Sequence, residues 1–137
     1  MEIKRLGPGD EDAVLAASAL FDKPADQGAT RRFLGDTGHH ILIAYEQGFP
    51  VGFVSGVEVT HPDKGTEMFV YELAVEERSR RRGIGLSLVE ALSSIARQRG
   101  CYGMWVLTAE DNPAALATYT RAGGTVETGQ AVVVWSF

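Results

Sequence analysis

A run of arginines and glycines in the middle of the chain has the composition of an anion-binding turn. It reads Arg80-Arg81-Arg82-Gly83-Ile84-Gly85, follows an apolar segment that ends at Val75, and precedes a segment with helical periodicity. Backbone N–H groups at the start of a helix lack carbonyl partners and form an anion site. Glycines let the backbone approach a ligand closely, and arginines add charge and forked hydrogen-bond donors. The turn therefore predicts a phosphate site, and a pyrophosphate suits it best.

Two common nucleotide-binding patterns do not fit this turn. The Walker pattern ends its glycines with a Lys followed by Ser or Thr, and no such pair follows here. The dinucleotide fingerprint G-x-G-x-x-G requires a third glycine where Leu88 stands. A solvated basic loop is the alternative for the charge run from Arg78 to Arg82. The glycines and the helix start coincide with this run, which favours the phosphate site.

The pattern R-x-x-G-x-G, carried by Arg80, Gly83 and Gly85, resembles the acetyl-CoA turn of the GNAT superfamily of N-acetyltransferases. The preceding Leu73-Ala74-Val75 resembles the strand that leads into this turn in that family. The resemblance implies the GNAT fold, with acetyl-CoA as cosubstrate and no metal.

A second GNAT-like pattern lies downstream. Asn112, Ala115 and Tyr119 match the family's N-x-x-A-x-x-x-Y helix, although Tyr119 taken alone reads as a core aromatic. The cofactor-binding residues that the resemblance implies are Leu73, Ala74, Val75, Arg80, Arg81, Arg82, Gly83, Ile84, Gly85, Leu86, Ser87, Asn112, Ala115 and Tyr119.

Within this superfamily the chain resembles the short aminoglycoside 3-N-acetyltransferases. Leu20-Phe21 and Phe33-Leu34 are similar to their N-terminal region, and Glu110-Asp111-Asn112-Pro113 is similar to their acidic stretch before the last helix. The segment Val70–Val75 is similar to their aromatic–acid–Leu–Ala–Val strand, with Glu72 where those enzymes usually carry Asp. The resemblance implies acetyl transfer to an aminoglycoside amine, with the 3-amino group as the expected position.

The distribution of charge agrees with a cationic acceptor. The chain has 13 basic and 18 acidic residues, a net charge of −5, and four of its arginines lie between positions 78 and 82. Aminoglycosides are polycations and require acidic walls. We expect Glu72, Glu110 and Asp111 to bind the substrate. The last two could instead only cap the following helix, and the sequence leaves this open.

The resemblance also implies a mechanism. Glu72 is expected to act as general base, directly or through water, because an ammonium cannot attack a carbonyl. Tyr119 would protonate the departing thiolate, a backbone N–H near Val75 would stabilise the developing oxyanion, and Asn112 would hydrogen-bond the pantetheine arm. Transfer is direct in this scheme, so Cys101 is not required.

The elements that must position these residues follow an α/β order of β-α-α-β-β-β-α-β-α-β-β. We expect a mixed, mostly antiparallel sheet of six or seven strands with about four helices. Gly52 and Gly56 mark candidate β-bulges. Strands are predicted over 2–6, 40–45, 51–59, 66–75, 102–108 and 131–137, and helices over 13–21, 29–34, 86–97 and 113–121.

Length and composition exclude several other classes. At 137 residues, with 45% hydrophobic and 23% charged residues, the chain fits one globular domain over 1–137. A lone cysteine allows no internal disulfide, and the three histidines show no metal-ligand spacing. No segment has the pattern of a signal peptide or membrane span. We expect a cytoplasmic protein that binds neither nucleic acid nor membrane, and the resemblance implies a homodimer.

Three other functions compete with aminoglycoside acetylation. The first is acetylation of another small amine, an amino acid or a peptide N-terminus by the same kind of domain. The second is a non-catalytic GNAT domain that binds CoA as a sensor, against which the presence of both Glu72 and Tyr119 argues. The third, nucleic-acid binding, has only the arginine cluster in its favour and lacks a basic stripe with interleaved aromatics.

Overall fold

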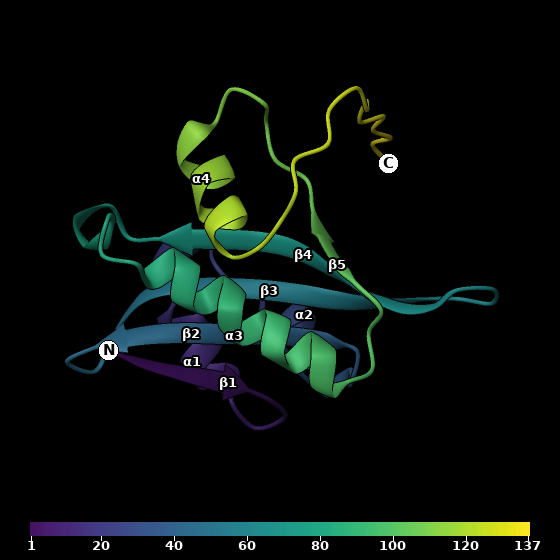
Figure 1. Cartoon of the computed structure of the whole chain (residues 1–137). Coiled ribbons are helices and arrows are strands. Elements are labelled where there is room, and N and C mark those ends of the chain that lie inside the picture. Colours follow the sequence, from purple (N-terminus) through teal and green to yellow (C-terminus); the bar gives the residue numbers. More distant parts are fainter.

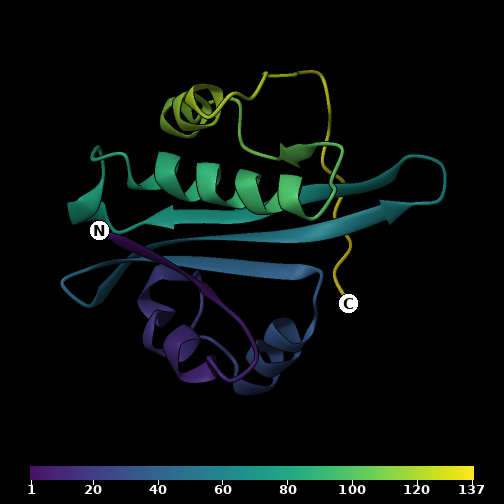
Figure 2. The same cartoon turned by 60° about the horizontal axis from the view of Figure 1, so that its bottom comes forward.

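The computed structural model describes residues 1–137 and contains a five-stranded sheet with helices on both faces (Figures 1 and 2). The strands are β1 (Glu2–Leu6), β2 (His39–Glu46), β3 (Phe49–His61), β4 (Gly65–Val75) and β5 (Met104–Val106). The helices are α1 (Glu11–Ala16), α2 (Gln27–Gly35), α3 (Ile84–Gln98) and α4 (Pro113–Arg121), with 3-10 turns at Ser18–Leu20 and Glu77–Ser79.

The strands lie in sequence order across the sheet, from β1 to β5. Neighbouring strands are antiparallel except β4 and β5, which pair in parallel. Figure 2 shows α3 along one face of the sheet and α1 and α2 on the other, while α4 lies beyond α3. The chain therefore encloses one core on each side of the sheet.

The two cores explain the helical periodicity of the sequence. On one face, Leu88, Leu92 and Ile95 of α3 pack on Val54 and Met68 of the sheet. This approach is close at Gly56, where a Cβ atom would lie 2.9 Å from both Leu92 Cδ2 and Met68 Sδ. On the other face, residues of α1 and α2 cover strands β2 and β3; this cluster consists of Val14, Ala17, Leu34, Ile41, Ile43 and Phe53.

A β-bulge in β4 changes which face its side chains reach. Ser55 of β3 pairs with Glu72, but the next residue, Gly56, pairs with Val70, so Tyr71 is the extra residue. Before the bulge Val70 belongs to the α3-side core, and after it Leu73 packs against that same core. Because strand side chains otherwise alternate, the extra residue turns Glu72 toward the α1–α2 face.

The element order predicted from sequence is confirmed up to α4, with three differences. The sheet has five strands instead of six or seven, and the strand expected over 131–137 is not formed. That segment is exposed and pairs with no strand, and strand propensity requires a partner to be realised. The strand expected over 102–108 is confined to Met104–Val106, and the first helix ends at Ala16, before a 3-10 turn.

None of the helices combines the length and the apolar character needed to cross a membrane.

Candidate active site

The anion-binding turn predicted from the sequence has the expected backbone geometry. Arg81 and Gly83 both have positive φ, at 64° and 80°, which turns the chain sharply into α3. Ser87 is the first residue of α3 whose backbone N–H donates a hydrogen bond, to the carbonyl oxygen of Gly83 at 3.0 Å. The N–H groups of Ile84, Gly85 and Leu86 therefore remain free for an anion, as at any helix start.

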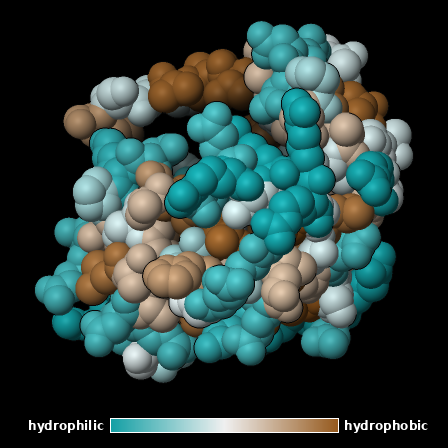
Figure 3. Space-filling view, turned by 90° about the vertical axis from the view of Figure 1, so that its left-hand side faces the viewer, coloured by the Kyte–Doolittle hydropathy of each residue, from teal (hydrophilic) through white to brown (hydrophobic).

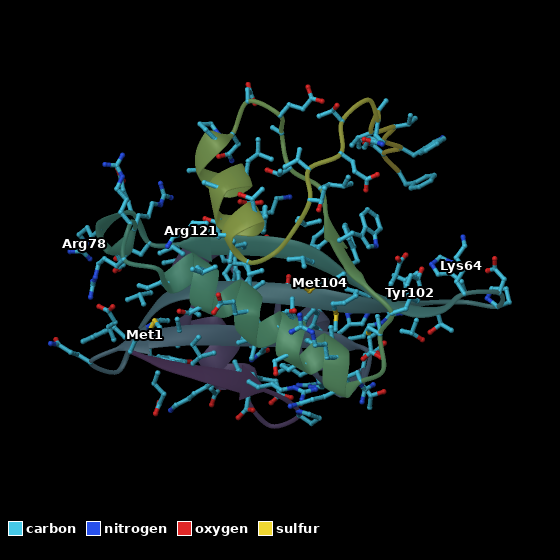
Figure 4. The ribbon with its side chains drawn as sticks, viewed as in Figure 1. Met1, Lys64, Arg78, Tyr102, Met104 and Arg121 are labelled. Atoms are coloured by element: carbon cyan, nitrogen blue, oxygen red, sulfur yellow. The ribbon has the colours of Figure 1, made fainter.

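The arginine side chains stabilise this turn through contacts and also give it positive charge. Arg80 Nε donates to the Val75 carbonyl oxygen at 3.0 Å, and Arg82 forms an ion pair of 2.8 Å with Glu46. Each guanidinium has further N–H donors that these contacts do not use. Figure 3 faces this end of the molecule and shows hydrophilic side chains over much of it, and Figure 4 marks Arg78 and Arg121 there.

A gap between β4 and β5 leads from this turn into the sheet. The two strands pair only as far as Val70 and Val106, while β4 continues to Val75 without a partner on that side. A Cβ atom at Gly85 would lie 3.6 Å from Thr118 Cγ2, 3.7 Å from Val75 Cγ2 and 3.9 Å from Leu73 Cδ2. The start of α3, the end of β4 and α4 thus meet beside Gly85, where the missing side chain leaves a space of about methyl size.

The groups of acetyl-CoA can be compared with the donors and backbone around this space. Its pyrophosphate requires donors such as the free N–H groups of α3, and its pantetheine arm requires unpaired strand backbone such as that of Tyr71–Val75. The free N–H groups and the unpaired strand backbone both lie beside Gly85. The residues of the turn and of β4 therefore fit this cosubstrate.

Helix α4 carries the second GNAT-like pattern. Asn112 caps the helix, because its side-chain oxygen accepts from the Ala115 N–H at 3.1 Å. The amide NH2 of Asn112 is left as a donor for a ligand. Tyr119 is half-buried, and burial raises the pKa of its phenol, so it stays protonated near neutral pH.

Glu72 lies where two hollows on the α1–α2 side of the molecule meet. We call them the inner hollow, of about 420 Å³, and the outer hollow, of about 610 Å³. Phe21, Tyr71 and Glu72 line both. The outer hollow also contains Asp22 and Lys23. The bulge is the reason that Tyr71 and Glu72, although adjacent, border the same space.

The pKa of Glu72 is raised by its burial and, second, by the negative charge of Asp22. A carboxylate with a raised pKa is a better proton acceptor near neutral pH. Asp22 was not among the residues predicted from the sequence. The only signal near it was the pair Leu20-Phe21, which marked this segment without singling out an acid.

The other two predicted substrate residues lie elsewhere. Glu110 and Asp111 are exposed in the connection between β5 and α4, and neither lines the inner or the outer hollow. They also do not cap α4, because Asn112 does. The structure thus groups Glu72 with Asp22 and leaves the acidic pair before α4 apart from both hollows.

Cys101 has the surroundings of a structural residue. It packs against the α3-side core, and burial raises the pKa of its thiol. A raised thiol pKa lowers the fraction of thiolate, which is the nucleophilic form.

Comparison with known proteins identifies the family. The profile of the acetyltransferase (GNAT) family matches residues 12–124, which include both hollows' lining strands, the arginine–glycine turn and α4. The chain belongs to the acetyltransferase (GNAT) family. Proteins of this family use acetyl-CoA as acyl donor, which agrees with the fit of the turn and β4.

Curated GNAT relatives share part of the sequence. The L-2,4-diaminobutyric acid acetyltransferases of Streptomyces coelicolor and Nocardia farcinica are 34% identical over 74 residues and 32% identical over 89 residues. These matches cover 53% and 65% of this chain but 42% and 43% of the two relatives. The chain thus spans less than half the length of these two proteins.

Solved structures share the GNAT fold along nearly the whole chain. The aminoglycoside acetyltransferase meta-AAC0020 from an uncultured soil metagenomic sample, in complex with sisomicin, has a TM-score of 0.90 at 19% identity, covering 99% of this chain and 95% of that one. This likeness shows the fold alone. The aminoglycoside acetyltransferase HMB0005, also from an uncultured soil sample, has a TM-score of 0.81 at 27% identity and covers 98% of each chain.

Proposed function

We propose that this protein is an N-acetyltransferase that moves the acetyl group of acetyl-CoA to a primary amine of a cationic small molecule. One observation carries the proposal: Glu72, with a raised pKa, faces the two hollows while its neighbour Leu73 packs on the face that carries α3. The base and the cosubstrate site are thereby close along β4 but open to opposite sides of the sheet.

Acetyl-CoA supplies an acetyl group activated as a thioester. The N–H groups of Ile84–Leu86 would hold its pyrophosphate, with Arg80, Arg81 and Arg82 adding charge. The unpaired backbone of Leu73–Val75 would bind its pantetheine arm, and Asn112 would add a hydrogen bond from its amide NH2. Ser87 lies in the first turn of α3, and Ala115 lies in the first turn of α4.

Glu72 would accept a proton from the amine, directly or through water. Only the neutral amine has a lone pair for attack, so a nearby carboxylate with a raised pKa serves the reaction. The second acid, Asp22, would hold the cationic substrate in the outer hollow. Tyr119 would protonate the departing thiolate, since its raised pKa keeps the phenol protonated and available as a proton donor near neutral pH.

For the acceptor, we propose an aminoglycoside, with the 3-amino group as the position. The outer hollow has two acids, Asp22 and Glu72, against one base, Lys23, and this excess of negative charge favours a cation. The likeness to the aminoglycoside acetyltransferase HMB0005, at 27% identity, supports the same choice. A homodimer, implied by the sequence resemblance, stays part of this proposal.

A second acceptor class is favoured by a separate observation. The relatives in Streptomyces coelicolor and Nocardia farcinica are named for 2,4-diaminobutyric acid, a small diamino acid. One charged amine of such a molecule could pair with Asp22 while the other approaches Glu72. This candidate requires only the outer hollow.

A thiol-release assay over a panel of amines tests the proposal. The panel is sisomicin, gentamicin, kanamycin, 2,4-diaminobutyrate and a short peptide with a free N-terminus, each with acetyl-CoA. Release of CoA that depends on sisomicin supports the aminoglycoside, and release with diaminobutyrate alone supports the second class. No amine-dependent release, together with tight binding of CoA, would make the protein a non-catalytic CoA-binding domain instead.

A further inference from the structure

The inner hollow has a lining that a polar amine alone would not fill. Nine of its 13 lining residues are hydrophobic, and they come from α1, the segment between α1 and α2, α2, and three strands of the sheet. Phe21 stacks edge-on against Phe53 with ring centroids 4.6 Å apart, and Phe33 does so against His39 at 5.1 Å. This aromatic lining belongs to a hollow of about 420 Å³, within the usual range of small-ligand sites.

The polar groups of the inner hollow are few, and one of them is held by a hydrogen bond. Ser55 Oγ accepts from the backbone N–H of Glu72 at 3.2 Å, so this hydroxyl holds the bulge in place. His39 Nδ1 is buried and has no hydrogen-bond partner. Glu72 lines both the inner and the outer hollow, so a carboxylate borders the apolar lining of the inner one.

We propose that the protein also acetylates primary amines that carry a compact apolar group, aryl or branched alkyl, and that this group inserts into the inner hollow. The inference rests on the proposed acetyl transfer at Glu72 and adds an acceptor class to it. The hydroxyl groups of a sugar ring would lose their hydrogen bonds to water in this hollow, whereas an aryl or alkyl group gains from the same burial.

The reaction balances in the same way for this class. The amine nitrogen forms a bond to the acetyl carbon, and the bond between that carbon and the sulfur of CoA breaks. Before attack the ammonium gives one proton to Glu72, which later returns it to solvent. As the amide forms, the nitrogen loses a second proton through solvent, and this proton replaces the one that Tyr119 gives to the leaving sulfur. The products are the N-acetylated amine and the free thiol of CoA.

Comparing 2-phenylethylamine with glucosamine, two amines of similar ring size, tests whether the hollow prefers an apolar group or only binds an amine. We expect kcat/KM for 2-phenylethylamine to exceed that for glucosamine by about tenfold or more, the usual discrimination of an apolar pocket. Ala29, on the α2 rim of the hollow, offers a way to fill it. Ala29→Leu should lower kcat/KM for 2-phenylethylamine at least about tenfold and leave glucosamine within about twofold.

A matched control keeps the variant interpretable. Ala16 is also an exposed helical alanine but does not line the hollow, so Ala16→Leu should leave both amines unchanged. Ala25→Leu fills the hollow from another segment and replaces Ala29→Leu if that variant does not fold. The inference would be overturned if a folded Ala29→Leu or Ala25→Leu variant had the same kcat/KM as the parent for both amines.

The failure of this inference differs from the failure of the proposed function. Turnover of sisomicin or diaminobutyrate, with 2-phenylethylamine no better than glucosamine, overturns the inference and leaves acetyl transfer standing. If no amine releases thiol, the proposed function is wrong, and calorimetry of 2-phenylethylamine with the CoA-loaded protein still tests the hollow. Binding that Ala29→Leu weakens would support an apolar-amine site, and absence of binding would overturn it.

Discussion

Gly85 offers a substitution that should separate cosubstrate binding from stability. The Cβ atom of Gly85→Ala would lie 3.6–3.9 Å from Thr118, Val75 and Leu73, which is ordinary van der Waals contact. Gly85 is the second residue of α3, and alanine is favoured over glycine inside helices by about 0.5–1 kcal/mol. We therefore expect the free energy of unfolding in urea to stay the same or to rise by less than about 1 kcal/mol.

The same methyl group would occupy the space between β4 and α4 where the proposal locates the pantetheine arm and pyrophosphate. Forcing one methyl group into a filled site costs about 1–3 kcal/mol, and 1.4 kcal/mol is a tenfold change in affinity. Calorimetric titration with CoA should thus give a dissociation constant for Gly85→Ala at least about tenfold above that of the parent.

The matched control is Gly35→Ala, at the last residue of α2, where a Cβ atom would meet nothing within 4 Å. This variant should leave both CoA affinity and stability close to the parent. Unchanged CoA affinity in a folded Gly85→Ala variant would refute the assignment of this space to the cosubstrate.

Three further predictions test other parts of the structure. Asp22→Asn removes a charge that raises the pKa of Glu72, so the acidic limb of the pH profile of kcat/KM should move to lower pH; no movement would contradict their coupling. Gly56→Ala introduces contacts of 2.9 Å in the core and should lower the urea unfolding free energy by about 1–3 kcal/mol; an unchanged value would mean that the core relaxes freely. Cys101→Ala should keep kcat within about twofold in the thiol-release assay, because direct transfer requires no thiol; a large loss would point to a covalent acetyl-enzyme.

The turn and α4 could be predicted from the sequence because their signals are local. Glycine spacing, clustered arginines and an Asn-Pro pair at a helix start determine nearby backbone geometry and need no distant partner. The structure accordingly has Gly83 in the left-handed region before α3 and Asn112 as the cap of α4.

The face on which Glu72 lies could not be predicted in the same way. The strand around it is apolar almost throughout, so its periodicity does not distinguish the two sides of the sheet. The deciding feature is the bulge at Tyr71, and its one local signal was Gly56 on the neighbouring strand. Asp22 was missed for a related reason, because it belongs to a loop that only the folded chain brings beside Glu72.

The C-terminal segment shows that strand propensity alone does not produce a strand. Residues 131–137 are rich in Val and aromatic residues, yet they are exposed and form no strand. Strand formation requires hydrogen bonds to a neighbouring strand, which composition alone does not supply.

The central claim, that Glu72 accepts the amine proton, is tested most directly by kcat/KM of Glu72→Gln in the thiol-release assay. Its control is Glu67→Gln, on the same strand, where the carboxylate is bonded to His61 and Tyr102 instead. We predict that Glu72→Gln loses about 10²-fold or more, with CoA affinity unchanged, while Glu67→Gln keeps its rate within a few-fold. A loss of less than about tenfold in Glu72→Gln would contradict the claim.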